Sequence, residues 1–504
     1  MHDLLLAKRG IALPATHGLR TAVERHKGRL QAELTKARIR RKLSSVESLK
    51  AHIESGQEIA ADNLEAPYPR WVRINTLKTT LEDQLETTFA GCGRAMTVDS
   101  VRQRNSKQLY LDEHVPNLVA VSPCVDLQKS EAYKSGSIIF QDKASCFPAY
   151  LLDPLTEDGD IIDTCSAPGN KTTHIAAILL SHNSEPEDCI QTIHAFEKNK
   201  GRAVTLEKMV NLAGLDAWIK IHPGQDFLKT DPNSPMFKDV GALLLDPSCS
   251  GSGIVGRDDM PELHMPGVGQ NTISTSRGSK KASQNRDTRK RKREEDEDLI
   301  MVDDDGVVTS VDTDDELKSR LAALSAFQVD ILRHAFKFPA ARKITYSTCS
   351  IHADENESVV KRALASDVAK QSGWRILTRD EQIRGMREWP IRGSHEACGK
   401  DTLLMESCIR ATKGDEHGTM GFFLAGFVRD QRPVAGVESQ FLRDERGHIV
   451  RDLLGMPVRA QPADRDGDGN GAEQENSVVA DRQGMGDEEW NGFSEDEGPA
   501  LDQA

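Results

Sequence analysis

The stretch GDIIDTCSAPGNKTTHIAAILL, residues 159–180, predicts a strand, a tight turn and a helix in immediate succession. The apolar strand ends at Asp163, Pro168 stiffens the turn, and Gly169 permits a close approach of backbone to a ligand. At such a turn the free backbone N–H groups and the positive helix end point toward a bound anion or carboxylate. The turn matches neither the G-x-G-x-x-G fingerprint nor a P-loop. It therefore predicts a ligand site of another kind, with a purely structural turn as the alternative.

The alternation of strands and helices continues as far as residue 349. Five apolar, strand-like runs are separated by segments whose apolar residues have helical spacing. Such alternation predicts an α/β, Rossmann-like fold, in which helices cover both faces of a parallel sheet. Ligands in these folds bind beyond the carboxyl ends of the strands. The predicted strands are 159–165, 189–196, 217–223, 241–247 and 341–349, and the predicted helices are 171–180, 200–214 and 317–336.

At 504 residues the chain is too long for one compact core, and its composition divides it into regions. Residues 1–60 predict a basic helical segment. Residues 61–143 mix short strands and helices and predict a small α+β domain. Residues 144–430 carry the alternating pattern, interrupted at 256–315 by a polar, charged insert that we expect to be disordered. Residues 431–504 form an acidic, Gly-rich tail that we also expect to be mostly disordered.

The formal net charge of −14 is unevenly distributed. Acidic residues gather in the tail, whereas the first 50 residues are strongly basic, so this arm can bind phosphates in an acidic protein. The alternative is a solvated helix face. A second basic run, Lys280–Lys281 followed by Arg289 to Arg293, resembles a two-part nuclear localisation signal. The basic residues of the arm include Arg25, Lys27, Arg29, Lys36, Arg38, Arg40, Arg41 and Lys42.

Composition also excludes several classes of protein. No run of about 18 apolar residues could span a bilayer, and the first residues lack the pattern of a secretory signal. We therefore expect no membrane partner and an intracellular location. The nine cysteines form neither a C-x-x-C pair nor a His/Cys cluster, so they read as thiols rather than as disulfides or zinc ligands. Nothing in the sequence implies a metal.

Two acidic residues follow the next strands of the pattern. Glu197 comes directly after the second strand, where an acid in nucleotide-binding folds accepts hydrogen bonds from a ribose diol; the alternative is an exposed turn carboxylate. Asp226 follows the third strand and is placed to bind the exocyclic amine of an adenine. Phe227 is a weaker candidate for stacking on that ring, because a lone aromatic residue after a strand is more often part of the core.

Two cysteines lie at the ends of the fourth and fifth strands, Cys249 in LLLDPSCSGSG and Cys349 in ITYSTCSIHADENE. Either one alone would usually be a small buried hydrophobe. Here both lie in turns rich in Gly, Ser and Thr, whose backbone donors can stabilise a thiolate. A helix is predicted to begin after Cys349, with Asp354 as its N-cap. The spacing does not decide which thiol is the nucleophile, and Asp246 is the nearest candidate acid.

Seven segments, in this order along the chain, resemble the Sun-domain RNA (cytosine-C5) methyltransferases. The resemblance covers about residues 66 to 430, and an ordered set of this kind is far more specific than any one member. It implies a Rossmann-like methyltransferase domain that uses S-adenosyl-L-methionine, preceded by a small RNA-binding domain. The segments are RWVRINTLK, FQDKASCFPAYLL, DTCSAPGNKT, HAFEKNKGR, LLLDPSCSGSG, ITYSTCSIHADENE and GFFLAGF.

The resemblance also implies roles for individual residues. Glu197 would hold the cofactor ribose, Asp226 the adenine, and Asp246 the region between cofactor and base. Cys349, which follows Thr348, would be the attacking nucleophile, and Cys249 would assist release of the product. The methionine part of the cofactor would be wrapped by Cys165, Ser166, Ala167, Pro168, Gly169, Asn170 and Lys171, while Arg73, Asn75 and Lys78 match a motif of the RNA-facing domain.

Two departures from the commonest family pattern narrow the expected substrate. Ser166 stands where alanine is frequent, and Ser248 separates Pro247 from Cys249. Both resemble the branch that modifies large-subunit ribosomal RNA, which implies a pre-ribosomal RNA partner and a nuclear, nucleolar location; we expect a monomer. The alternatives are the same chemistry on transfer RNA or another RNA, and a non-catalytic RNA-binding ribosome-assembly factor. A DNA substrate is disfavoured by the RNA-family spelling of the RINTLK segment and of the Cys349 turn.

Overall fold

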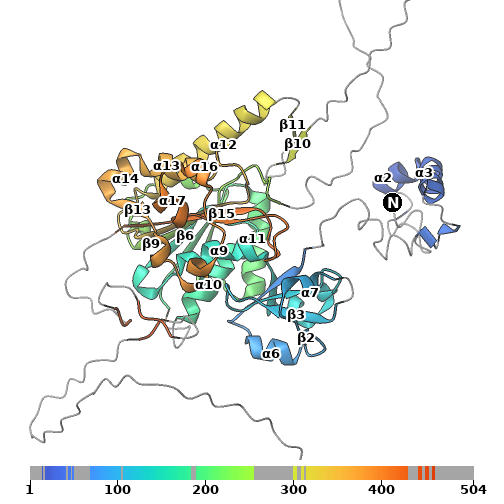
Figure 1. The fold of residues 1–504 in the computed structure, drawn as a ribbon, viewed down its shortest axis with the longest axis horizontal. Coiled ribbons are helices and arrows are strands. Elements are labelled where there is room, and N and C mark those ends of the chain that lie inside the picture. The colour runs from blue at the N-terminus through green and yellow to red at the C-terminus, as the bar shows by residue number, and fades with distance from the viewer. Residues whose placement is uncertain are drawn as a thin grey trace, which may run out of the picture. The chain divides into compact units, whose positions relative to one another are not determined.

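The computed structural model describes most of the chain between residues 68 and 429 (Figure 1). The shorter pieces before and after this part include two helices, α2 (Gly18–Glu24) and α3 (Lys27–Arg40), within the predicted basic helical segment 1–60. The described residues are 14, 17–40, 44–46, 48–49, 68–103, 106–182, 189–254, 299–302, 308–311, 314–429, 441–444, 449–452 and 457–459.

The expected α/β fold is confirmed by an eight-stranded sheet in which five adjacent strands, from β12 to the edge strand β8, are parallel. The order along the sheet is β13-β15-β12-β9-β6-β7-β8, with β14 also paired to β15. The chain runs outward from β6 to one edge and then returns to β9 on the other side of β6. A crevice at such a reversal is where open α/β sheets bind ligands. The strands are β6 (Asp160–Asp163), β7 (Ile193–Glu197), β8 (Ile219–Pro223), β9 (Val240–Leu245), β12 (Lys343–Thr348), β13 (Trp374–Ile376), β14 (Ile409–Ala411) and β15 (Phe422–Arg429).

Alternate residues of the central strands build two separate cores. In β9, Leu243 and Leu245 face a core that includes Val329 of helix α12 (Asp314–Ala335) and residues of α13 (Glu357–Leu364). Ala242 and Leu244 face the opposite core. Because successive side chains of a strand point to opposite faces, one continuous apolar run can fill both cores. Figure 1 shows helices on both sides of the sheet; those of the second core are α9 (Lys143–Leu152), α10 (Asn170–Ser181) and α11 (Lys200–Ala213).

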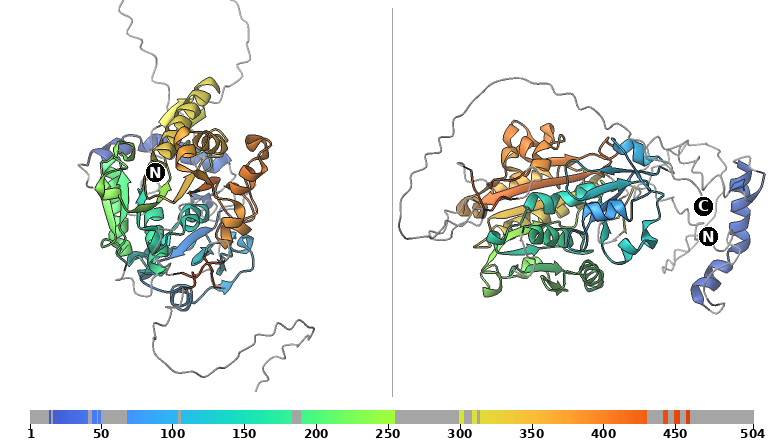
Figure 2. Two further views of the ribbon diagram at one scale, coloured as in Figure 1. Left: turned by 90° about the vertical axis from the view of Figure 1, so that its left-hand side faces the viewer. Right: turned by 90° about the horizontal axis from the view of Figure 1, so that it is seen from below.

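A second sheet, with order β2-β3-β4-β1-β5, forms the small α+β unit that precedes the larger sheet. Val72 and Ile74 of its inner strand β1 point into the unit's own core. Trp71, on the other face, packs in a cluster with Phe147 and Trp389 of the larger unit. Figure 2 shows the two sheets from further directions. The elements are β1 (Arg70–Ile74), α6 (Leu81–Glu86), β2 (Gly93–Arg94), α7 (Val98–Arg102), β3 (Gln108–Leu111), β4 (Leu118–Val121), α8 (Glu131–Lys134) and β5 (Ile138–Phe140).

The end of the predicted disordered insert has regular structure. Strands β10 (Leu299–Val302) and β11 (Val308–Val311) pair antiparallel, and α12 begins at Asp314. Two apolar, β-branched runs around Asp305–Gly306 are a hairpin signal that the compositional argument overlooked. Residues 255–298, the basic run among them, and 460–504 of the tail lie outside the described residues. Within the described part of the chain, no helix is both long and apolar enough to cross a membrane.

Buried histidines predict that the fold loses stability in acid. Burial lowers the pKa of His114, His182 and His222 to about 4, from 6.5. A folded-state pKa below the unfolded value means that the unfolded chain binds more protons between pH 6.5 and 4, so stability falls as the pH drops through this window. For His182, whose side chain is 4% exposed, the loss between pH 7 and 5 is on the order of 1 kcal/mol, or about 2–4 °C in Tm.

Thermal unfolding of wild type and His182→Asn at pH 7 and pH 5 tests this. We expect the Tm of the variant to fall less than that of wild type between the two pH values. His395→Asn, at an exposed position, serves as the control and should follow wild type. Equal acid shifts in wild type and His182→Asn would show that His182 does not contribute to the acid sensitivity.

Candidate active site

The predicted site residues come together at the carboxyl ends of the parallel strands. Cys165 to Lys171 follow β6, Glu197 ends β7, and Asp226 follows β8 by three residues. Asp246 and Cys249 follow β9, and Cys349 follows β12. Strands β6 and β9 are neighbours, and β12 lies beside β9. The sheet therefore collects residues from five separate segments along one edge.

The loop after β6 is shaped by Gly169 and by hydrogen bonds within the turn. Gly169 caps helix α10 with a φ of 111°, a conformation that L side chains rarely adopt. A Cβ atom there would also lie 3.0 Å from Met209 Cγ and 3.1 Å from Leu206 Cδ1 of helix α11. Ser166 Oγ donates to the Asp163 carbonyl at 2.9 Å, and Thr172 Oγ1 donates to Asp163 Oδ2 at 2.7 Å. The glycine thus lets the loop and α11 pack closely.

Polar groups of this loop fit a cofactor with an amino-acid end. The side-chain oxygen of Asn170 is buried and has no hydrogen-bond partner among the described residues. Burial and the nearby charge of Asp246 raise the pKa of Asp163 to about 7, although its hydrogen bond from Thr172 opposes this. A buried acceptor without a partner costs free energy unless a ligand or water satisfies it. The loop is therefore suited to bind the methionine part of S-adenosylmethionine.

Glu197 is buried and linked to this loop. Its Oε1 accepts a hydrogen bond from Asn199 N at 2.7 Å, and Arg202 Nε lies 3.8 Å from its Oε2. The same Arg202 donates to the carbonyl of Ala167 at 2.8 Å. The carboxylate is thus held in place at the end of β7, as a ribose-binding acid requires, and the alternative of an exposed turn carboxylate is wrong because Glu197 is buried.

Asp226 lies beside a cavity of about 400 Å³ at the end of β8. Its Oδ1 accepts from Leu228 N at 3.1 Å, and its Oδ2 pairs with the exposed Lys198 at 3.1 Å. Phe227, in contrast, points into the core, where it stacks on Phe338 and is 3% exposed. Stacking of Phe227 on an adenine is therefore ruled out by its orientation.

The two cysteines predicted to carry the chemistry are in contact. Cys249 Sγ lies 3.1 Å from Cys349 Sγ, although the residues are 100 positions apart in sequence. Cys249 is buried and Cys349 is partly exposed. The carbonyl of Cys349 accepts a hydrogen bond from Gly253 N at 2.8 Å, which joins the turn after β12 to the turn after β9. Of the two thiols, Cys349 is therefore the more accessible to an incoming substrate.

Asp246 and Lys171 form an ion pair beside the thiols. Lys171 Nζ lies 2.8 Å from Asp246 Oδ2 and 3.0 Å from Ser145 Oγ, and Ser347 Oγ donates to Asp246 Oδ1 at 2.5 Å. Burial lowers the pKa of Lys171, but Asp246 and a charged Cys349 outweigh this effect, so the pKa is raised overall. The ammonium is thus close enough to Cys349 to favour a thiolate there. The sequence had placed Lys171 only in the cofactor loop.

The segment after Cys349 differs from the sequence prediction. Helix α13 begins at Glu357 with Asn356 as the N-cap, not at Asp354. Glu355, Asn356 and Glu357 are all fully buried, which is unusual for three consecutive polar residues. The contacts of Glu355 and Asn356 with the cysteine turns were missed in the sequence, where an acidic run was read as a helix-start signal. The available signal was the position of these two residues, six and seven places after a candidate nucleophile.

The RINTLK segment of β1 connects the two units. Arg73 is buried and donates to Gln141 Oε1 at 2.7 Å and to Thr173 Oγ1 of α10 at 2.9 Å; burial lowers its pKa to about 10. Asn75 Nδ2 donates to the carbonyl of Ala213 at 3.1 Å, and Lys78 Nζ donates to that of Leu212 at 2.7 Å, both at the end of α11. Arg73 thus fixes the small unit against α10, which begins at the cofactor loop, and Asn75 and Lys78 fix it against the end of α11.

Two family models match the chain. The ferredoxin-like domain of NOL1/NOP2/Sun domain family member 5 matches residues 68–141, and the 16S rRNA methyltransferase RsmB/F model matches residues 149–266. The first model covers the small sheet, and the second covers β6 to β9 with the cofactor loop, Glu197, Asp226 and Cys249. The second range therefore covers four of the eight strands of the larger sheet, and β12 to β15 with Cys349 lie beyond it.

Three curated proteins are similar over most of the chain. The 25S rRNA (cytosine-C(5))-methyltransferase rcm1 of Schizosaccharomyces pombe is 36% identical over 86% of this chain and 76% of its own. A 28S rRNA (cytosine-C(5))-methyltransferase of Mus musculus is 32% identical over 80% of this chain and 70% of its own. The 25S rRNA (cytosine-C(5))-methyltransferase NSUN5 of Arabidopsis thaliana is 31% identical over 85% of this chain and 59% of its own.

Proposed function

Because the chain belongs to the NOL1/NOP2/Sun family of S-adenosylmethionine-dependent RNA (cytosine-C5) methyltransferases, in the branch of member 5, we propose that it methylates a cytosine of large-subunit ribosomal RNA. The substrate follows from the three relatives, each of which is named for the large-subunit RNA of its organism. We propose further that the reaction passes through a covalent bond between Cys349 and the base. The observation that carries this mechanism is the 3.1 Å contact between the two thiols beside the Asp246–Lys171 ion pair.

Cys349 is the proposed nucleophile because its thiol is partly exposed and lies near the Lys171 ammonium. C5 of cytosine is a poor nucleophile by itself. When the Cys349 thiolate adds to C6, the electrons of the C5–C6 double bond make C5 carbanion-like. S-adenosylmethionine, when bound, supplies a methyl group on a sulfonium that such a carbon can attack. Asp246, as a carboxylate, would accept a hydrogen bond from the 4-amino group of the base and so orient the ring.

Cys249 is proposed to assist the last step. After methylation a base removes the proton on C5, the electrons of that bond restore the C5–C6 double bond, and the bond from C6 to Cys349 Sγ breaks. The thiol of Cys249, 3.1 Å away, can donate a hydrogen bond to the sulfur as it leaves as a thiolate. This contact stabilises the leaving group without forming a bond to the base.

The substrate assignment is tested with labelled S-adenosylmethionine and three purified RNAs in parallel. We expect label in large-subunit rRNA and none in transfer RNA or small-subunit rRNA. Label in transfer RNA would replace the proposed substrate by the same chemistry on another RNA. Absence of label from all three RNAs, with cofactor binding intact, would favour a ribosome-assembly factor that binds RNA without catalysis.

A nucleolar location is part of the proposal, since ribosomal RNA is transcribed and first assembled there. The basic run 280–293 that resembles an import signal lies outside the described residues, so its sequence alone supports this step. A fluorescent fusion of the full chain should concentrate in nucleoli. The same fusion with Arg289 to Arg293 replaced by alanine should stay in the cytoplasm; nuclear entry of both would remove that role from the run.

The ion pair gives a further prediction. Asp246→Asn removes the partner of a Lys171 side chain that is only 16% exposed and weakens the contact proposed for the 4-amino group. We expect kcat/KM for methyl transfer to fall by about 100-fold or more. Asp239→Asn, at a carboxylate that is 66% exposed and outside the site, should leave kcat/KM unchanged. A normal rate for Asp246→Asn would remove Asp246 from the mechanism.

A further inference from the structure

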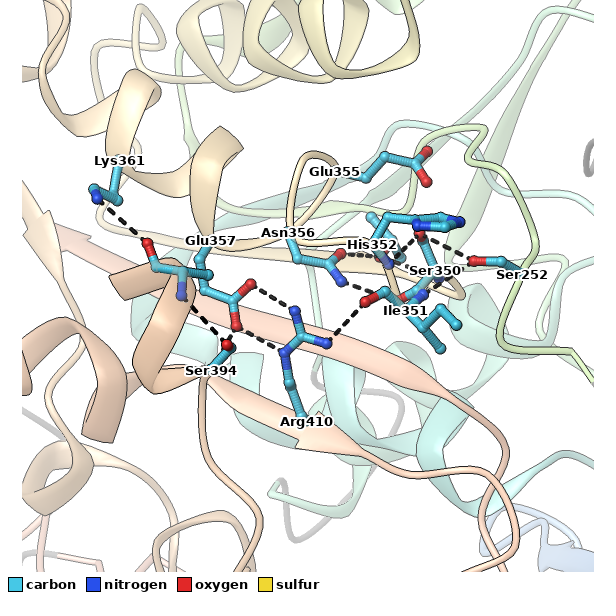
Figure 3. A network of polar contacts seen from close by, with 12 residues as sticks. Ser252, Ser350, Ile351, His352, Glu355, Asn356, Glu357, Lys361, Ser394 and Arg410 are labelled. Atoms are coloured by element: carbon cyan, nitrogen blue, oxygen red, sulfur yellow. Dashed lines mark hydrogen bonds and ion pairs between the residues drawn. The ribbon is translucent and has the colours of Figure 1, made fainter. Parts of the chain in front are cut away.

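The residues on either side of each cysteine are held by buried polar side chains that lie on α12 and directly before α13. Figure 3 shows the part of this network that joins Asn356, Ser350 and Ser252, with Glu355 beside it. Glu355 and Asn356 are adjacent in sequence and fully buried, yet their side chains contact different turns. Each of the two cysteine turns is therefore held by a different side chain.

Asn356 holds the turn that carries Cys349. Its Oδ1 accepts a hydrogen bond from Thr348 Oγ1 at 2.5 Å, and its Nδ2 donates to the carbonyl of Ser350 at 2.9 Å. Thr348 and Ser350 are the two neighbours of Cys349. One side-chain amide therefore holds the side chain of the residue before the proposed nucleophile and the backbone of the residue after it.

Glu355 and Gln328 hold the turn that carries Cys249. Glu355 Oε1 accepts from Ser250 N at 2.9 Å and from Gln328 Nε2 at 3.0 Å. Gln328 Nε2 also donates to the carbonyl of Ser248 at 3.1 Å. Ser248 and Ser250 are the two neighbours of Cys249. Glu355 and Gln328 therefore hold the backbone on both sides of Cys249.

The two supported turns also bond to each other. Ser250 Oγ donates to Ser350 Oγ at 3.0 Å, and Ile351 N donates to Ser252 Oγ at 3.1 Å. The 3.1 Å contact between the thiols thus depends on the side chains that hold each cysteine turn and on the serines that join the two turns. Loss of the side chains that hold one cysteine turn would shift the thiol of that turn relative to the base and to the other thiol.

We propose that Asn356 is a positioning residue for the attack by Cys349, and that Gln328 and Glu355 are positioning residues for the release assisted by Cys249. The inference rests on the proposed covalent mechanism. We call Asn356 the Cys349 clamp, and Gln328 with Glu355 the Cys249 clamp. Loss of the Cys349 clamp therefore slows formation of the covalent adduct, whereas loss of the Cys249 clamp slows its breakdown. A network that served stability alone would not divide its effects between two steps in this way.

The experiment compares Asn356→Ala, Gln328→Ala and the control Gln382→Ala. Gln382 is also a buried glutamine whose Nε2 donates to a backbone carbonyl, that of Ser407 at 2.7 Å, but it lies outside both turns. Single-turnover methyl transfer, steady-state turnover and the covalent protein–RNA adduct on a denaturing gel are measured for each. Asn356→Ala should lose about 100-fold in the single-turnover rate without adduct. Gln328→Ala should keep that rate, lose about tenfold in steady-state turnover and accumulate adduct.

Conservative variants separate positioning from a general loss of packing. Thr348→Ser keeps the hydroxyl that donates to Asn356 and should retain the wild-type single-turnover rate. Thr348→Val lacks this hydroxyl and should lose as much of that rate as Asn356→Ala. Glu355→Gln keeps an acceptor for Ser250 N and should release product faster than Glu355→Ala. Equal slowing of both steps by the two clamp variants, or effects like those of Gln382→Ala, would overturn the proposal.

A measurement without RNA distinguishes this inference from the proposed function. Alkylation of each thiol by iodoacetamide is followed by mass spectrometry on the free enzyme. Gln328→Ala should speed alkylation of Cys249 several-fold more than that of Cys349, because the turn that buries Cys249 is loosened. If wild type methylates no RNA but the alkylation pattern holds, the proposed function fails and the clamps stand. If wild type methylates RNA but Gln328→Ala speeds alkylation of both thiols equally, the positioning roles fail and the proposed function stands.

Discussion

Cys349→Ala is expected to abolish methyl transfer to RNA, with a fall in kcat/KM of at least about 1,000-fold, equivalent to about 4 kcal/mol in the activation barrier. The reason is chemical: without the addition at C6, C5 of cytosine stays too electron-poor to take the methyl group. Because Cys349 is partly exposed, its truncation should leave the fold intact. The measurement is transfer of labelled methyl to large-subunit rRNA, with Tm and cofactor binding followed in parallel.

The control for this variant is Cys124→Ala, which removes an exposed thiol of the small unit. It should transfer methyl at the wild-type rate. An active Cys349→Ala enzyme would show that the nucleophile is another group, and Cys249 would be the first to examine because its sulfur lies 3.1 Å away. Loss of cofactor binding together with activity would instead assign Cys349 to the structure of the site.

Cys249→Ala is expected to trap the covalent intermediate. The first turnover should proceed, since Cys349 and the Asp246–Lys171 pair are unchanged, but steady-state turnover should fall by about 100-fold or more. The physical cause is the lost hydrogen bond to the departing sulfur of Cys349. A band of protein bound to RNA, stable to denaturant and removed by ribonuclease, is the expected observation.

Two further variants make this result specific. Cys398→Ala truncates a cysteine that is as buried as Cys249 but outside the site, and it should give no adduct. The double variant Cys249→Ala with Cys349→Ala should also give none, because the attacking sulfur is absent. Normal turnover of Cys249→Ala without an adduct would contradict the two-cysteine mechanism, while an adduct in the double variant would place the covalent bond on a different residue.

The strand pattern allowed the larger fold to be predicted, since each of the five predicted strands is present and their apolar residues fill two cores. The predictions were wrong where they rested on composition and not on the spacing of apolar residues. The hairpin of β10 and β11 fell in a region judged by its charge. The predicted N-cap, Asp354, was also wrong: the N-cap of α13 is Asn356, whose side chain bonds the neighbours of Cys349 and makes no capping hydrogen bond.

The sequence by itself determined the order of elements and the residue types at each strand end, including Cys165 to Lys171, Glu197, Asp246 and both cysteines. These are local properties, because apolar periodicity and turn composition are written within a few residues. The boundaries of the regions 1–60, 61–143, 144–430 and 431–504 stay predictions.

Only the tertiary structure decided which of these residues act together. It brought Cys249 within 3.1 Å of Cys349, paired Lys171 with Asp246, turned Phe227 into the core and assigned the buried Glu355 and Asn356 to separate cysteine turns. The physical reason is that, whereas the contacts of Asn356 are local, the Lys171–Asp246, Cys249–Cys349 and Glu355–Ser250 contacts join segments 75, 100 and 105 residues apart. Such contacts depend on the order of strands in the sheet and on the packing of α12 and α13 against it, and neither is encoded in any short stretch of the chain.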